Sequence, residues 1–136
     1  MTVDKNIALS IWRAAFGSAE WAQDCFGTWM NVHAYSNEIV SMRRPGYGCD
    51  YDYSWNIDHI RPISSFENEN DANFRNNFEP VHRQNNLQKL DNFPGFKINE
   101  ESYNVVKTDN YYGYGIKDSN GNRIDWKAKT NKYYEE

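Results

Sequence analysis

One stretch of the chain, residues 55–91, restricts the fold more than any other part of the sequence. Residues 55–60 alternate in the manner of a β-strand that a proline ends, and residues 78–82 form a second short extended segment. Between them lies a polar loop over residues 64–76, rich in Asn and Glu, and residues 83–91 follow as a short helix. The order strand, long loop, strand, short helix is the framework of the predicted fold.

The predicted helix has an apolar and a polar face. Leu87 and Leu90 are three residues apart, so we expect them to pack inward. Asn86 and Lys89 are also three apart and therefore share a face. This second face presents an amide and an ammonium group close to the two strands.

The segment before the framework is predicted to be mainly helical. Apolar residues recur at helical spacing over residues 7–16, and Gly17 is a natural end to that helix. A second short helix is expected over residues 18–25. Residues 43–53 are rich in Pro, Gly, Tyr and Asp, which predicts turns and short extended pieces.

The segment after the framework is predicted to be extended. Residues 103–106 are one candidate strand, and residues 112–117 and 123–127 flank an Asn-Gly turn at residues 120–121, which is a strong hairpin signal. We therefore expect one α+β domain over residues 1–136.

Composition limits the partners of this chain. Its 136 residues carry 15 Lys and Arg against 19 Asp and Glu, a formal net charge of −4. That balance argues against a freestanding high-affinity nucleic-acid binder, so any phosphate chemistry has to come from a local site.

Cysteine usage and hydropathy exclude two further classes of protein, those with a four-cysteine zinc site and those with a membrane-spanning helix. Cys25 and Cys49 cannot form a CxxC pair, which excludes a four-cysteine zinc site. No apolar run approaches the roughly 20 residues that a membrane helix needs. The first residues lack the layout of a secretory signal. We therefore expect a cytoplasmic protein with reduced thiols and no membrane partner.

The polar residues of the framework suit metal-assisted hydrolysis of a phosphodiester. Asp58 and His59 are adjacent at the end of the first strand, Asn77 opens the second strand, and Asn86 lies in the helix. Carboxylate and amide oxygens are hard ligands for a divalent cation. An imidazole with a pKa near ~6.5 can take a proton from water.

These residues resemble the HNH (ββα-metal, or His-Me finger) endonucleases, in particular those of small bacterial or phage type. Residues 55–62 (Trp-Asn-Ile-Asp-His-Ile-Arg-Pro) look like the first motif of that family. Asn77, which opens the sequence Asn-Phe-Glu-Pro, is similar to its middle asparagine. Asn86, three residues before Lys89, falls at the third motif position, which is most often His and in some members Asn.

The resemblance implies a ββα-metal core at about residues 55–91, surrounded by N-terminal helices and followed by a C-terminal β-hairpin. It implies a metal-dependent endonuclease that hydrolyses DNA, with double-stranded DNA favoured. His59 would be the general base, Asp58 and Asn86 would hold one Mg²⁺ or Mn²⁺, and Asn77 would brace the loop behind His59. No structural zinc is expected, because the paired cysteines of some family members are absent.

Substrate contacts are predicted less specifically. Arg61, His82 and Lys89 are the candidate substrate-binding residues, and Lys89 could hold a phosphate oxygen. A surface or supporting role for His82 and a solvated helix position for Lys89 remain open. The aromatic residues near the C-terminus could stack on bases, although aromatic alternation in a hairpin is more often packing. These residues are Tyr111, Tyr112, Tyr114 and Trp126.

Two features of the pattern leave alternatives open. The chain has 18 asparagines, so Asn76 could replace Asn77, and Asn85 could replace Asn86. Successive side chains of a regular strand face opposite ways, so Asp58 and His59 need a turn at the strand end to share one site.

Two other functions compete with the nuclease. A degenerate fold of this kind could bind nucleic acid or a protein without cutting, and the net charge of −4 favours that alternative slightly. A toxin or defence effector could take its targeting from a protein partner. The complete set of acidic residue, histidine and two asparagines favours the nuclease.

Overall fold

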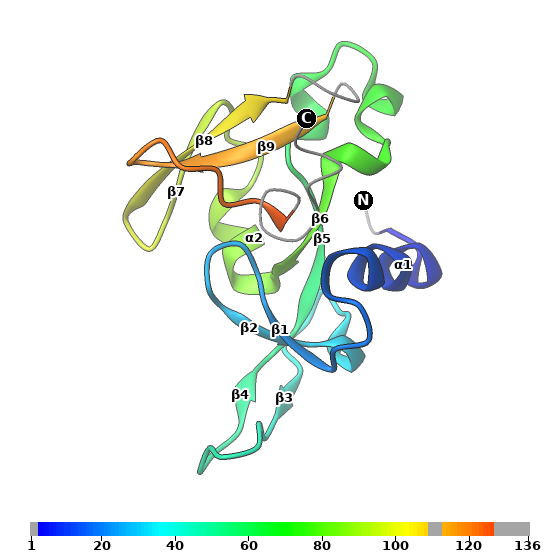
Figure 1. Cartoon of the computed structure of the whole chain (residues 1–136). Coiled ribbons are helices and arrows are strands. Elements are labelled where there is room, and N and C mark those ends of the chain that lie inside the picture. The colour runs from blue at the N-terminus through cyan, green and yellow to red at the C-terminus, as the bar shows by residue number, and fades with distance from the viewer. Residues whose placement is uncertain (1–2, 109–112, 127–136) are drawn as a thin grey trace.

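The centre of the fold is an antiparallel pair of strands, β5 (Trp55–His59) and β6 (Phe78–His82) (Figure 1). This computed structural model describes residues 3–108 and 113–126. The helix α2 (Arg83–Lys89) follows β6 directly and packs on the pair. The predicted order of strand, loop, strand and helix is confirmed, and the chain is a mixed α+β protein.

The remaining elements precede and follow this centre. None of the described helices is long and apolar enough to cross a membrane. In chain order, the other helix and strands are α1 (Lys5–Phe16), β1 (Trp21–Gln23), β2 (Trp29–Asn31), β3 (Ser41–Met42), β4 (Tyr51–Asp52), β7 (Gly95–Ile98), β8 (Glu101–Lys107) and β9 (Tyr114–Asp118).

Different helices cover the two faces of the β5–β6 pair. Figure 1 shows α1 and α2 on opposite sides of it. Trp55 and Ile57 of β5 pack into the hydrophobic core that α1 supplies, with Trp12 of the helix at its centre. Because strand side chains alternate, Asn56 and Asp58 face the other way, toward α2. The face of β5 toward α1 therefore carries the apolar Trp55 and Ile57, and the face toward α2 carries the polar Asn56 and Asp58.

The first predicted helix is confirmed as α1. The carboxylate of Asp4 accepts a hydrogen bond from the backbone N–H of Asn6 and caps its N-terminus. Gly17 ends the helix with a positive φ of 65°, a conformation that suits glycine.

The second predicted helix, over residues 18–25, is wrong. The chain instead forms the antiparallel hairpin β1–β2, in which Trp21 pairs with Asn31 and Gln23 with Trp29. The turn is closed by Asp24, whose Oδ1 accepts hydrogen bonds from the N–H groups of Phe26 (3.0 Å) and Thr28 (2.9 Å). The Asx turn at Asp24 forms in place of the predicted helix, because so short a helix is not stable alone.

Asp24 also ties this hairpin to the start of α2. Its Oδ2 accepts hydrogen bonds from the backbone N–H of His82 (3.0 Å) and from Nδ2 of Asn85 (2.8 Å). Asp24 and both of these partners are buried. The N-terminal hairpin is therefore fixed to the junction of β6 and α2 by one carboxylate.

The prediction that Leu87 and Leu90 pack inward is wrong. Leu87 is 53% exposed and Leu90 is 61% exposed, whereas Lys89 is completely buried. The inward face of α2 is polar, because Asn85 and Lys89, four residues apart, meet polar partners in the body of the protein. The hydrophobic spacing therefore predicted the position of α2 correctly but predicted the wrong face of the helix to be buried.

The long loop between β5 and β6 is more ordered than its composition predicts. It contains three short 3₁₀ helices, Ile63–Ser65, Glu69–Ala72 and Arg75–Asn77. Short pieces of this kind satisfy backbone groups in a connection with few apolar side chains. Residues 43–53 form the connection and second strand of the small hairpin β3–β4, as predicted.

The C-terminal part is a three-stranded antiparallel sheet in the order β7-β8-β9. The strand over residues 103–106 is confirmed within β8, but β7 was not predicted. Asn99 and Glu100 join β7 to β8 with positive φ values of 50° and 71°, a two-residue hairpin turn without the expected glycine. After β9, Arg123 pairs with Lys117 in an isolated bridge, so the Asn-Gly turn is confirmed, but the predicted strand over residues 123–127 does not form across residues 124–126. Residues 112 and 127 lie outside the described residues.

Replacing Asp24 with Ala should lower the free energy of unfolding by about 2–3 kcal/mol, because two buried donors at the start of α2 lose their acceptor. Urea denaturation monitored by tryptophan fluorescence measures this difference. The matched control is Asp50→Ala, since Asp50 pairs with Arg43 at the surface and should have no measurable effect. Equal stability of the two variants would contradict this role for Asp24.

Candidate functional site

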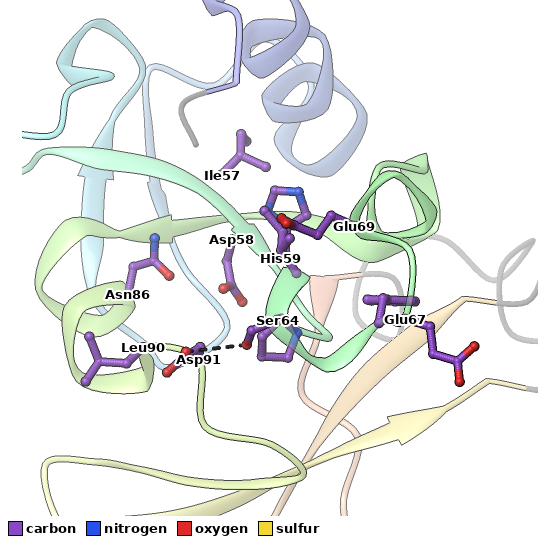
Figure 2. A pocket seen from close by; sticks show the side chains of 12 residues that line it. Ile57, Asp58, His59, Ser64, Glu67, Glu69, Asn86, Leu90 and Asp91 are labelled. Atoms are coloured by element: carbon purple, nitrogen blue, oxygen red, sulfur yellow. Dashed lines mark hydrogen bonds between the residues drawn. The ribbon is translucent and has the colours of Figure 1, made fainter.

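A cleft of about 590 Å³ lies along the end of β5, between α2 and the loop that follows β5 (Figure 2). Asp58, His59 and Asn86 all line it. The lining also includes Glu67, Glu69 and Asp91, so the rim is acidic. Three of the predicted site residues are thus brought together at one cleft.

Asp58 and His59 point in opposite directions from β5, as strand geometry requires, yet both border the cleft. The carboxylate of Asp58 lies on the α2 side, and the ring of His59 lies on the side of the loop (Figure 2). The His59 ring also contacts Phe78 on β6, with ring centroids 5.0 Å apart. The cleft runs across the end of the strand, so no reversal of either side chain is needed.

Asp58 has one oxygen satisfied and one oxygen without a hydrogen-bond partner. Oδ1 accepts a hydrogen bond from Nζ of Lys89 at 3.2 Å. Oδ2 is buried and accepts none from the residues that the structure describes. Burial raises the pKa of Asp58, although the Lys89 ammonium opposes the shift. A positive charge placed beside Oδ2 would therefore stabilise the ionised form of Asp58.

Lys89 does not reach the cleft, which corrects the prediction that it holds a substrate phosphate. Its Nζ donates to the backbone oxygens of His59 (3.1 Å) and Ile60 (2.9 Å) as well as to Asp58. Three acceptors satisfy all three ammonium protons, and the side chain is completely buried. Lys89 therefore fixes the end of β5 to α2.

The ring of His59 is oriented by an asparagine that sequence reasoning missed. Nε2 of His59 lies 2.9 Å from Oδ1 of Asn73 in the loop. Because a carboxamide oxygen only accepts, Nε2 carries the proton and Nδ1 keeps its lone pair. No pattern marks Asn73 among the asparagines of that loop, so only the folded loop reveals it.

The environment of His59 favours the neutral imidazole. Burial lowers the pKa of His59, and the Asn73 hydrogen bond and the Asp58 charge oppose the shift without reversing it. A neutral ring with a lone pair on Nδ1 can accept a proton near neutral pH.

Asn77 bridges backbone groups across the loop in the way its amide chemistry suggested. Its Oδ1 accepts from the N–H of Arg61 (2.8 Å), and its Nδ2 donates to the carbonyl oxygens of Arg61 and Ala72, both at 3.0 Å. The side chain is completely buried. It fixes the chain directly after His59 to the far end of the loop, so its effect on the site is indirect.

The structure distinguishes Asn86 from Asn85. Asn86 lines the cleft with Asp58, whereas Asn85 is buried on the other side of α2 and binds Asp24 and Oγ1 of Thr28 (2.9 Å). Figure 2 draws the amide oxygen of Asn86 on its Asp58 side. Only Asn86 is placed to act with Asp58.

His82 and Arg61, both predicted to bind substrate, are occupied elsewhere. Nδ1 of His82 accepts a hydrogen bond from the N–H of Gln84 and caps α2, while Nε2 lies 2.8 Å from the carbonyl oxygen of Asp52.

Arg61 donates hydrogen bonds to Ser65 and, at 2.8 Å, to the hydroxyl of Tyr114. Neither residue lines the cleft, so both predictions are corrected to supporting roles.

The predicted stacking cluster is packing where the structure describes it. Tyr114 packs near Phe66 and Phe74, with ring centroids 6.1 and 6.2 Å away. Trp126 is 4% exposed and donates its indole N–H to the carbonyl oxygen of Phe78. Tyr111 and Tyr112 lie outside the described residues.

Two residues of the cleft fit a hard divalent cation. Oδ2 of Asp58 is an orphaned buried oxygen, and the carboxamide oxygen of Asn86 accepts no hydrogen bond from the described part of the chain. The described residues contain no group of three or more His, Cys, Asp or Glu side chains placed to hold a metal. An ion here would therefore take few protein ligands and keep most of its water, as Mg²⁺ commonly does.

Comparison with protein-family models, with curated proteins and with solved structures gave no match. The function of the cleft has to be inferred from its own geometry and chemistry.

Replacing Lys89 with Met should lower the free energy of unfolding by about 3–5 kcal/mol, because the Asp58 carboxylate stays buried without its cation. Urea denaturation measures the change, and Lys97→Met, at an exposed position of β7, is the control. The loss should be smaller when Lys89→Met is made in an Asp58→Asn background. An equal loss in both backgrounds would contradict the ion pair.

The pKa of His59 in the metal-free protein should lie below the ~6.5 of an unperturbed histidine. Because the folded state favours the neutral ring, the stability that His59 contributes is present above about pH 6.5 and is lost as the pH falls. An NMR titration of the ring proton measures the pKa, with the urea-unfolded chain as the reference. A folded-state pKa equal to or above the unfolded value would contradict this assignment.

Proposed function

We propose that this chain is a metal-dependent endonuclease of the HNH type that hydrolyses phosphodiester bonds of DNA. One observation supports it above the others: at one cleft, a buried carboxylate with an orphaned oxygen stands beside a histidine whose Nδ1 keeps its lone pair. The first arrangement suits a cation and the second suits a proton acceptor. The sequence resemblance to HNH nucleases and the strand–loop–strand–helix order lend further support.

In the proposed reaction His59 is the general base. Its Nδ1 takes a proton from the attacking water while the new P–O bond forms and the bond to the leaving 3′-oxygen breaks. Asn73 keeps Nε2 protonated and the ring in place. Asn77 holds the loop that positions both residues.

Asp58 and Asn86 would hold one Mg²⁺ or Mn²⁺. When bound, such an ion supplies Lewis-acid stabilisation of charge on the phosphate and on the leaving oxygen. Lys89 holds Asp58 through Oδ1, so Oδ2 is left without a hydrogen-bond partner among the described residues, on a side chain that lines the cleft. The donors are oxygens, which disfavours zinc in a closed site of nitrogen and sulfur ligands.

The acidic rim bears on how DNA would bind. Glu67, Glu69 and Asp91 line the same cleft as Asp58, and none of the residues described there is a Lys or Arg. Phosphates would be repelled from such a cleft unless a divalent cation offset the charge. We therefore expect DNA affinity as well as cleavage to depend on the metal, with a protein partner as an alternative source of affinity.

Purified protein should nick supercoiled plasmid in millimolar Mg²⁺ or Mn²⁺ and should fail to do so in EDTA. His59→Ala should reduce the rate by about 10²–10⁴-fold, because a positioned acid–base group typically contributes that much. Gel electrophoresis of plasmid and of single-stranded DNA measures the rate.

The matched control is His33→Ala, because His33 is exposed and lies outside the cleft. Its cleavage rate should equal that of the wild type. If wild-type protein binds DNA in the presence of metal but never cuts it, the nuclease is contradicted and the binding module is favoured. A His59→Ala protein as active as the His33→Ala control would contradict the assignment of the base.

A further inference from the structure

Asn56 makes a hydrogen-bond relay with two other asparagines beside the cleft. Its Oδ1 accepts from Nδ2 of Asn86 at 2.6 Å, and its Nδ2 donates to Oδ1 of Asn37 at 3.3 Å. The three side chains come from separate parts of the chain: a loop after β2, strand β5 and helix α2. The relay therefore has one direction, because each amide donates to the next oxygen.

The strand geometry explains why this relay ends at the cleft. Asn56 and Asp58 are two residues apart on β5, so both face α2, where Asn86 lies. Asn86 also lines a second cleft of about 360 Å³, together with Asn37 and Asn56. With a cleft on each side, the Asn86 side chain is held mainly by its bond to Asn56.

The bond to Asn56 decides which end of the Asn86 amide faces Asp58. The oxygen and nitrogen of a carboxamide are nearly equal in size, so a half-turn of the side chain exchanges them at little steric cost. The oxygen of Asn56 accepts only an N–H. It therefore selects the rotamer with Nδ2 toward Asn56 and Oδ1 free for another partner.

We propose that Asn56 is a positioning residue that presents the oxygen of Asn86, and not its N–H group, to a divalent cation bound with Asp58. This inference rests on the proposed function, because it assumes a cation at Asp58 and Asn86. The role needs only an acceptor at position 56. It is therefore specific to one atom of the side chain.

The test compares Asn56→Leu with Asn56→Asp by electron paramagnetic resonance titration of Mn²⁺ into the protein. Leu has about the same size as Asn and cannot accept a hydrogen bond, so it should weaken Mn²⁺ binding by about 10–100-fold, as losses of outer-shell partners do. Asp keeps the acceptor, so Mn²⁺ affinity should stay within about threefold of the wild type or increase. Urea denaturation of both variants establishes that they are folded, and Asn104→Leu, on an exposed strand position, is the control.

Each outcome is decisive. Weak binding by Asn56→Leu with binding restored in Asn56→Asp supports the positioning role, because simple loss of packing would not be rescued by a charged residue. If the wild type binds Mn²⁺ in a manner that Asp58→Asn abolishes, but Asn56→Leu binds equally well, this inference alone is overturned. If the wild type binds no Mn²⁺, the proposed function is overturned, and this inference with it.

Discussion

The buried ammonium group of Lys89 is the interaction on which the site depends. It joins the end of α2 to the side chain of Asp58 and to two successive backbone oxygens at the end of β5. A buried ammonium group needs a hydrogen-bond acceptor for each of its protons, because an unpaired buried charge costs several kcal/mol. The same contact engages one oxygen of Asp58 and leaves the other without a hydrogen-bond partner among the described residues. The carboxylate of Asp58 therefore has two roles: it pairs with the buried Lys89, and it is the proposed ligand of the cation.

Much of the framework could be predicted from local patterns. The alternation of residues 55–60, the short extended segment at 78–82 and the helical stretch after it gave β5, β6 and α2. The grouping of Asp58, His59 and Asn86 at one cleft agrees with the residues chosen from sequence. Asn77 makes the backbone bridges that its amide allows. Periodicity and turn chemistry are local properties, so they predict the strands and the helix, whereas the choice of the site residues came from the resemblance to HNH nucleases.

The remaining features depend on tertiary contacts that local patterns do not encode. Lys89 is buried and Leu87 is exposed because acceptors at the end of β5 lie under α2, which reverses the face that hydrophobic spacing favours. Residues 18–25 do not form a helix but enter the hairpin β1–β2, in which Asp24 closes the turn with one oxygen and binds the junction of β6 and α2 with the other. Asn73 could not be distinguished from the neighbouring asparagines until the loop was folded over His59.

The central claim is that the orphaned oxygen of Asp58 and the amide oxygen of Asn86 hold a divalent cation. Crystals soaked in millimolar Mn²⁺ and measured near the manganese absorption edge test this directly, because anomalous scattering locates the ion itself. The account predicts one peak in the cleft, at bonding distance (about 2.0–2.2 Å for such ions and oxygen) from Oδ2 of Asp58 and the oxygen of Asn86. A map without a peak at Asp58, or with the ion held only by the acidic rim residues, would contradict it.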